Sequence, residues 1–263
     1  MTETIFDKIL AAKRRRVEAL YKAADFDALK TTATEVRGRI RSHRLRSALE
    51  IAERINIIAE IKRASPSKGV INADVDVAET ALRYRDGGAA AISVLTEEDL
   101  FEGSLDDLRI VRSTVDLPIL RKDFVVDEFQ IYETAAAGAD IMLLIVAALT
   151  EDELNSFLRI GRDELGMDVI VEVHTGEELD TAIAIGADII GVNNRNLKTF
   201  DVSLETSRRL IAKRPGGALM ITESGLSTRD EITELKGLGY DGFLIGESLM
   251  RTANAANTLK NWI

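Results

Sequence analysis

Ionisable side chains of both signs stand where short apolar runs of this sequence end. Glu60 and Lys62 flank Ile61 at the end of the run Ile57–Ile61, so the alternation of a strand would point both charges to one side. Lys122 follows a later run in the same way. A lysine in such a place can be a general acid, a Schiff-base nucleophile or a clamp for a carboxylate. Taken alone, the first pair is equally compatible with a single ion pair at the edge of a sheet.

Eight short apolar runs alternate with amphipathic stretches from residue 57 onward, which is the pattern of a parallel sheet covered by helices. The strands are expected at 57–61, 90–95, 117–120, 141–146, 169–173, 189–192, 219–222 and 242–245. Glycines at helix C-cap positions recur about every 50 residues, or two strand–helix units, at Gly88, Gly138, Gly186 and Gly239. Such a repeat favours a closed (β/α)8 TIM barrel. An open doubly wound sheet is the alternative, but its G-x-G-x-x-G fingerprint is missing after the first strand.

The first 55 residues carry helical periodicity, with Phe6, Ile9 and Val17 on one face and Leu45 and Leu49 on a later one. We therefore expect one barrel domain over residues 1–263, of which 1–55 is an N-terminal helical extension.

The composition is that of an ordinary soluble globular protein, with 263 residues, 46% hydrophobic and 30% charged. The absence of cysteine and the presence of two histidines exclude thiolate and His-rich metal sites. A net charge of −10 argues against a nucleic-acid partner, and no apolar run approaches the ~20 residues that span a bilayer. The sequence predicts a cytoplasmic protein with no membrane partner.

One basic cluster runs against the acidic balance, with five arginines and His43 between Arg37 and Arg46. Such a cluster can bind phosphate or nucleic acid. No aromatic residue is interleaved with the arginines, so a solvated face is the favoured interpretation.

In a barrel, chemistry lies at the carboxyl ends of the strands. Polar or ionisable residues follow most of the expected strands there: Glu60, Lys62 and Ser65; Lys122 and Asp123; Glu172 and His174; Asn193 and Arg195; Glu223 and Ser224; Glu247. Convergence of so many strand ends indicates a site.

The same rim has features of an anion site and of a pocket wall. Gly225 and Gly246 follow the last two strands, where barrels commonly bind phosphate through backbone N–H groups. Ser65, in the expected flexible loop Ser65–Gly69, could complete it, and Arg195 suits a planar anion. Phe124, Leu143 and Ile92 would supply apolar wall, and His174 is interpreted as a neighbour that orients a partner.

The ordered set of motifs resembles the indole-3-glycerol phosphate synthase family. It comprises IAEIKRASPSKG at 58–69, LRKDFV at 120–125, LLIV at 143–146, GVNNRNL at 191–197, TESG at 222–225 and IGESLMR at 245–251. The resemblance implies ring closure of 1-(2-carboxyphenylamino)-1-deoxyribulose 5-phosphate, with release of CO2 and water and without metal or organic cofactor. It also implies a small phosphorylated partner, and we expect a monomer.

The resemblance implies catalytic roles for five residues. Lys122 would be the general acid that protonates the substrate carbonyl, and Lys62 would bind the substrate carboxylate. Glu172 would be the general base for dehydration, with Glu60 assisting. Asn193 would hold substrate hydroxyls.

The resemblance also implies two sets of binding residues. Phe124, Leu143, Arg195, Glu223 and Ser224 would frame the substrate. The phosphate would lie on Ser65, Gly225, Gly246 and the backbone of Glu247. The chain has His174 where some relatives have Asn, and Glu247 where others have Ser.

Two rival functions are compatible with the same rim. One is another phosphosugar barrel enzyme, either an isomerase or an aldolase that forms a Schiff base on Lys122. The other is a non-catalytic sensor of a phosphorylated ligand.

Overall fold

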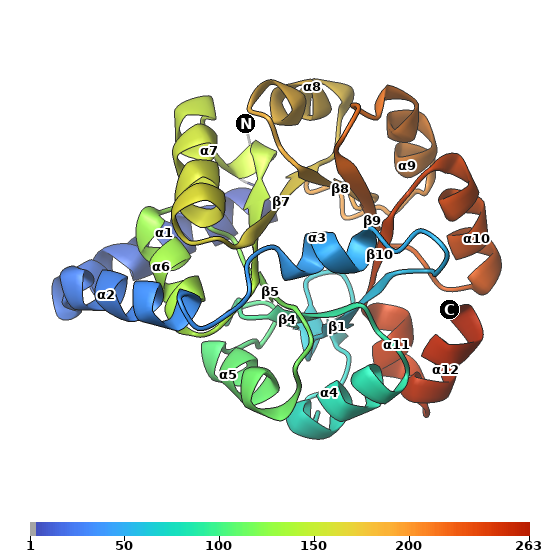
Figure 1. Ribbon diagram of the computed structural model, residues 1–263, viewed down its shortest axis with the longest axis horizontal. Coiled ribbons are helices and arrows are strands. Elements are labelled where there is room, and N and C mark those ends of the chain that lie inside the picture. The colour runs from blue at the N-terminus through green and yellow to red at the C-terminus, as the bar shows by residue number, and fades with distance from the viewer. Residues whose placement is uncertain (1–3) are drawn as a thin grey trace.

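The computed structural model describes residues 4–263, and its centre is a closed barrel of eight parallel strands (Figure 1). Around the barrel the strands follow the order β1-β10-β9-β8-β7-β6-β5-β4. They are β1 (Ile57–Ile61), β4 (Ala91–Leu95), β5 (Ile119–Lys122), β6 (Ile141–Ile145), β7 (Asp168–Val173), β8 (Ile189–Asn193), β9 (Leu219–Glu223) and β10 (Gly242–Ile245). Because β1 pairs with both β4 and β10, the sheet has no open edge. The (β/α)8 prediction is confirmed.

Helices surround the barrel, and left-handed glycines follow four of them. The helices are α4 (Val77–Asp86), α5 (Leu105–Thr114), α6 (Glu128–Ala136), α7 (Glu151–Leu158), α8 (Gly176–Ala184), α9 (Glu205–Leu210), α10 (Arg229–Leu238), α11 (Glu247–Arg251) and α12 (Ala255–Trp262). Shorter helical turns lie at η1 (Val146–Ala148), η2 (Arg159–Glu164) and η3 (Ile211–Lys213). Gly88, Gly138, Gly186 and Gly239 all have positive φ at these helix ends, as the sequence repeat predicts.

Strand alternation divides the apolar core into two layers. Ile58, Leu120 and Ile170 pack together inside the barrel, while alternate side chains such as Ile92 pack outward with residues of the surrounding helices. The prediction that Ile92 lines the pocket is therefore wrong, because its place in the alternation points it away from the barrel axis.

Three helices precede the first strand and reach both ends of the barrel. They are α1 (Ile5–Ala23), α2 (Phe26–Arg37) and α3 (Arg44–Leu49), and α3 crosses the barrel in Figure 1. Leu45 and Leu49 enter the inner core, and the backbone N–H of Leu45 donates to Asp168 at the start of β7 over 2.7 Å. Helix α3 therefore closes the amino end of the barrel. At the opposite end, Phe6 of α1 packs against Phe124, with ring centroids 6.1 Å apart.

The basic cluster between 37 and 46 has a structural use. Arg37 is 6% exposed, and its guanidinium donates to the backbone carbonyls of Leu165, Ala139 and Gly166. Arg44 forms an ion pair with Asp140 at 3.3 Å. The solvated-face interpretation is wrong for these two arginines, because they attach the extension to loops at the amino end of the barrel.

Two local predictions also need correction. The expected loop after β1 contains a small antiparallel hairpin, β2 (Ala64–Ser65) with β3 (Gly69–Val70). The third strand lies at 119–122 instead of 117–120, and its last residue is Lys122. In residues 4–263 no helix has the length and apolar character needed to cross a bilayer.

Candidate active site

Every second side chain of each strand points into the barrel. Along a strand these inward-pointing side chains begin in the apolar core and end at the carboxyl rim. In β5 the row runs from Leu120 to Lys122, and in β7 from Ile170 to Glu172. The apolar members fill the inner core, and the ionisable members stand one step nearer the rim. The same row in β9 ends at Glu223, so strand geometry alone directs three charges to one place.

Lys122 is held between two buried carboxylates. Its Nζ lies 2.7 Å from Oε2 of Glu172 and 3.4 Å from Oε2 of Glu223, and both glutamates are 1% exposed. The amide of Asn193 donates to the other oxygen of Glu172 over 3.1 Å. Glu172 therefore has a partner on each oxygen.

A second acid–base pair stands on β1. Lys62 Nζ donates to Glu60 Oε1 over 2.7 Å, as the two-residue spacing predicts. A side chain at position 246 would clash with the Glu60 carboxylate, and one at Gly191 would clash with that of Glu223. Glycine at these two positions therefore leaves room for buried carboxylates within the barrel mouth.

Burial and neighbouring charges have opposing effects on the pKa values of Lys122 and Glu172, and their balance decides which of these groups are ionised. Burial lowers the pKa of Lys122, but Glu172, Glu223 and Glu60 outweigh it, so the pKa is raised. Burial raises the pKa of Glu172, yet the charges of Lys122 and His174 lower it overall. Glu223 has its pKa raised by burial and by Glu172. The ligand-free site thus holds a protonated lysine and an ionised Glu172 at neutral pH.

Two adjoining cavities open at this rim, one of about 370 Å³ and one of about 100 Å³. Glu60, Lys62, Lys122, Asn193, Arg195 and Ser224 line both of them. Gly225, Gly246, Glu247 and Glu223 line only the larger cavity, and Ser65, Phe124, Leu143 and Glu172 only the smaller. Apart from Ile92 and His174, the residues that the sequence predicts for the site therefore line these cavities, with Ser65 at the smaller one and the two glycines with which it was grouped at the larger one.

The larger cavity has additional polar lining to which the interpretation of the sequence gave no role. Ser227, Ser248 and Arg251 border it beside the backbone turn of Ser224 and Gly225. Both residues of that turn have positive φ, 66° and 86°. A serine near glycines does not by itself indicate a binding site, because serine and glycine are also common in ordinary turns.

The smaller cavity is walled by aromatic and aliphatic side chains from several elements. Its apolar lining comprises Phe6, Ile9, Leu95, Phe101, Phe124, Leu143, Ile145, Leu197 and Phe200. Phe101 and Phe124 lie 6.3 Å apart between ring centroids. Phe6 and Ile9 belong to α1, so the N-terminal extension forms part of the pocket, which residue spacing could not reveal.

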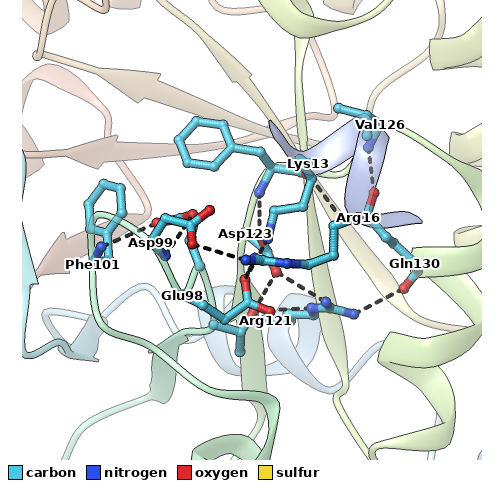
Figure 2. A network of polar contacts seen from close by, with 12 residues as sticks. Lys13, Arg16, Glu98, Asp99, Phe101, Arg121, Asp123, Val126 and Gln130 are labelled. Carbon is cyan, nitrogen blue, oxygen red and sulfur yellow. Dashed lines mark hydrogen bonds and ion pairs between the residues drawn. The ribbon is translucent and has the colours of Figure 1, made fainter. Parts of the chain in front are cut away.

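Behind the rim, a buried ion network joins α1 to the end of β5 (Figure 2). Lys13 Nζ lies 2.8 Å from Asp123 and 3.0 Å from Glu98. Asp123 also pairs with Arg121 at 3.0 Å and accepts a hydrogen bond from Thr96 over 2.7 Å. Because Asp123 directly follows Lys122, the network fixes the backbone that presents the lysine.

Replacing Lys13 with methionine is expected to lower the free energy of unfolding by about 3 kcal/mol, since it removes one cation from a buried carboxylate. Asp123 keeps Arg121 as a partner, which places the effect at the low end for buried pairs. Urea denaturation would measure it. Lys8→Met, an exposed position on the same helix, is the matched control. Equal stability of both variants would show that the network does not secure α1.

A model of the family described as indole-3-glycerol phosphate synthase matches residues 6–262. The chain belongs to the indole-3-glycerol phosphate synthase family. The motif resemblance is thereby confirmed, and the chain is a member of a family of carboxy-lyases in tryptophan biosynthesis.

Individual relatives in the indole-3-glycerol phosphate synthase family cover nearly the whole chain. The protein of that name from Laribacter hongkongensis is 47% identical over 257 residues, covering 97% of each chain. Its namesake from Chloroherpeton thalassium is 44% identical over 263 residues, covering 96% of this chain and 97% of the relative.

Solved structures show the same fold at low sequence identity. The 3-hexulose-6-phosphate synthase of Salmonella typhimurium superposes with a TM-score of 0.64 at 14% identity, covering 79% of this chain and 96% of the other. Thiamine phosphate pyrophosphorylase of Pyrococcus furiosus has a TM-score of 0.61 at 17% identity, covering 83% and 95%. At such identities the likeness concerns the barrel alone.

Proposed function

We propose that this family member converts 1-(2-carboxyphenylamino)-1-deoxyribulose 5-phosphate to indole-3-glycerol phosphate by lysine and glutamate acid–base catalysis. The observation that supports it best is the position of Lys122, Glu172 and Asn193 where a polar cavity meets an aromatic one. A substrate with a sugar phosphate at one end and a carboxyphenyl ring at the other needs two such compartments, joined by acid–base groups.

Lys122 is proposed as the general acid of ring closure. Its raised pKa keeps the amine protonated, so it can donate a proton to the C2 carbonyl oxygen of the sugar. The aromatic carbon that bears the carboxylate attacks C2 and forms the new carbon–carbon bond. Loss of CO2 then returns the electron pair to the ring. The same protonation disfavours a Schiff-base mechanism, which requires the free amine.

Glu172 is proposed as the base of the final dehydration. The C2 hydroxyl leaves as water with a proton from the ammonium group of Lys62, which lines both cavities, and Glu172 removes a proton from the neighbouring C1 carbon, so that the indole double bond forms. Its lowered pKa in the free site supplies the ionised form, and the pKa rises when Lys122 turns to the substrate. Glu60 assists from β1, and Asn193, which already bonds Glu172, holds a sugar hydroxyl.

The two ends of the substrate would bind in different cavities. The phosphate is proposed to lie in the larger cavity against Gly225, Gly246 and the backbone of Glu247, and Ser65 of the hairpin, which lines the adjoining smaller cavity, is proposed to reach it from there. Lys62 lines both cavities and would bind the substrate carboxylate.

The remaining binding residues frame the ring and the sugar between the two ends. Phe124 and Leu143 would contact the ring, while Arg195, Glu223 and Ser224 border the sugar. Holding both ends brings the reacting carbons together, an effect that can reach ~7–11 kcal/mol.

The direct experiment is to supply this substrate to the purified protein and follow indole absorbance in the presence of EDTA. We expect turnover with stoichiometric CO2 release and no loss in the chelator. Absence of indole product at every pH between 5 and 9 would contradict the proposal, and borohydride trapping of a substrate adduct would point to the aldolase instead.

We also propose that the enzyme acts in the cytoplasm as a monomer. Residues of one chain suffice to bring Lys62, Lys122 and Asn193 together at both cavities, which supports the monomer. Sedimentation equilibrium should return a mass close to 28.9 kDa, and a stable dimer would contradict the monomer.

A further inference from the structure

His174 lies between the proposed base and a second glutamate. Its Nδ1 is 3.0 Å from Oε2 of Glu178 on α8, and its backbone N–H donates to the same oxygen over 2.7 Å. Its Nε2 is 3.3 Å from Oε1 of Glu172. The His174 side chain is 10% exposed, and Glu178 holds its ring in place. Glu172 lies between this ring and the smaller cavity.

The charges around the ring keep it protonated. Burial lowers the pKa of His174, but the hydrogen bond to Glu178 on α8 and the negative charges of Glu172 on β7 and Glu178 outweigh it and raise the pKa to about 9. Lys122 from β5 and Glu223 from β9 stand on the far side of Glu172. At neutral pH the imidazolium therefore adds a fixed positive charge beside the proposed base.

The Nε2 atom is shielded from solvent and has no hydrogen-bond partner within residues 4–263. Its 3.3 Å contact with Glu172 is an ion-pair contact that lacks hydrogen-bond direction, while that carboxylate is held by Lys122 and Asn193. When Lys122 turns to the substrate, one oxygen of Glu172 is released. A small rotation of the carboxylate would then align it with the waiting Nε2–H.

We propose that His174, held by Glu178, is a positioning residue that orients Glu172 and keeps it ionised once Lys122 has turned to the substrate. The inference rests on the proposed function, in which Glu172 is the base. It extends the site by two residues that do not touch the substrate themselves and act only through the carboxylate.

The kinetic test compares pH profiles of kcat for His174→Leu and Glu178→Gln. Without the imidazolium the pKa of Glu172 rises, so the acidic limb of kcat should move up by about one pH unit in the leucine variant. At pH values below the midpoint of that limb this corresponds to about tenfold lower kcat, with KM within about threefold because substrate contacts remain. Glu178→Gln should shift the limb in the same direction by less.

Matched variants keep the outcome interpretable. His43→Asn alters the only other histidine, which lies on the amino side of the barrel 3.4 Å from Asp168, and should leave the profile unchanged. If the leucine variant fails to fold, His174→Gln removes the same charge while keeping a polar side chain. An acidic limb identical to wild type in the folded variants would overturn the inference.

A second arm does not depend on turnover. The chain has two histidines, so the imidazole NMR signals can be assigned with the His43→Asn variant alone. We expect His174 to titrate near pH 9, and Glu172→Gln to lower that midpoint by about one unit. An unchanged midpoint would refute the coupling even in an active enzyme. If the midpoint falls as expected but the wild-type protein makes no indole, the coupling stands and the proposed function is refuted.

Discussion

Replacing Lys122 with methionine is expected to lower kcat for indole formation by about two to four orders of magnitude, the range for loss of a general acid. Methionine keeps an unbranched apolar chain of nearly the same length and lacks the ammonium group. Both CO2 release and indole absorbance should be lost, because protonation of the carbonyl precedes every later step. Single-turnover assays that follow the two products together would measure this.

The Lys122→Met variant also needs a test of its fold, because Glu172 and Glu223 lose the cation between them. Their carboxyls are expected to take up a proton instead of unfolding the barrel. Circular dichroism melting would report any loss of structure. Lys260→Met, at an exposed position of α12, is the control for removal of a lysine. A kcat for Lys122→Met within about fivefold of the control would refute the general-acid assignment.

Replacing Glu172 with glutamine is expected to cost a similar factor in indole formation, about 10² to 10⁴, but to affect a different step. If Glu172 acts in dehydration, ring closure and decarboxylation still proceed. A single turnover with substrate labelled in the carboxylate should then release labelled CO2 without indole absorbance. This separates the base from Lys122, whose loss should abolish both products.

The control for Glu172→Gln is Glu177→Gln, an exposed position in the first turn of α8 that faces neither cavity. Its kinetics should match wild type. Simultaneous loss of CO2 and indole in Glu172→Gln would move the residue to ring closure, and retention of both would remove it from the mechanism.

The barrel and most of the residues at its rim could be predicted because side chains along a strand alternate between its two faces with a period of two residues. Once Ile170 is placed in a strand with its side chain inward, Glu172 must follow it toward the rim, and the same holds for Leu120 and Lys122. The glycines after the helices supplied the repeat that closes the sheet. Both patterns involve residues that are close together in the chain, so they can be recognised in a single sequence.

The errors share a different cause, which is tertiary contacts that the apolar pattern of a short stretch of sequence does not reveal. The third strand was expected to end at Leu120, because Arg121 interrupts the apolar run. Arg121 is nevertheless buried, since Asp123 and Glu133 neutralise it. Ile119 begins the strand because Pro118 has no N–H to donate to a sheet ladder.

The same cause explains the parts of the site that spacing did not reveal. Lys13 and Phe6 join the rim from α1 through contacts with residues about one hundred positions later. Helix α2 was also missed, because its apolar stripe is thin and is completed only by packing on α6. Neither feature has a local pattern strong enough to predict it.

Helix α3 closes the amino end of the barrel, and this constrains the order in which the N-terminal helices can dock during synthesis. Arg37 bonds a carbonyl 128 residues later, and the amide of Leu45 a carboxylate 123 residues later. Helices α1 and α2 therefore cannot dock until α6 has been made, and α3 cannot complete its contacts until β7 has been made. Until then their apolar faces have no partner, which makes the half-made chain the state most exposed to aggregation. Helix α3 precedes every strand of the barrel in the chain, yet it completes its contacts only after β7 has been made.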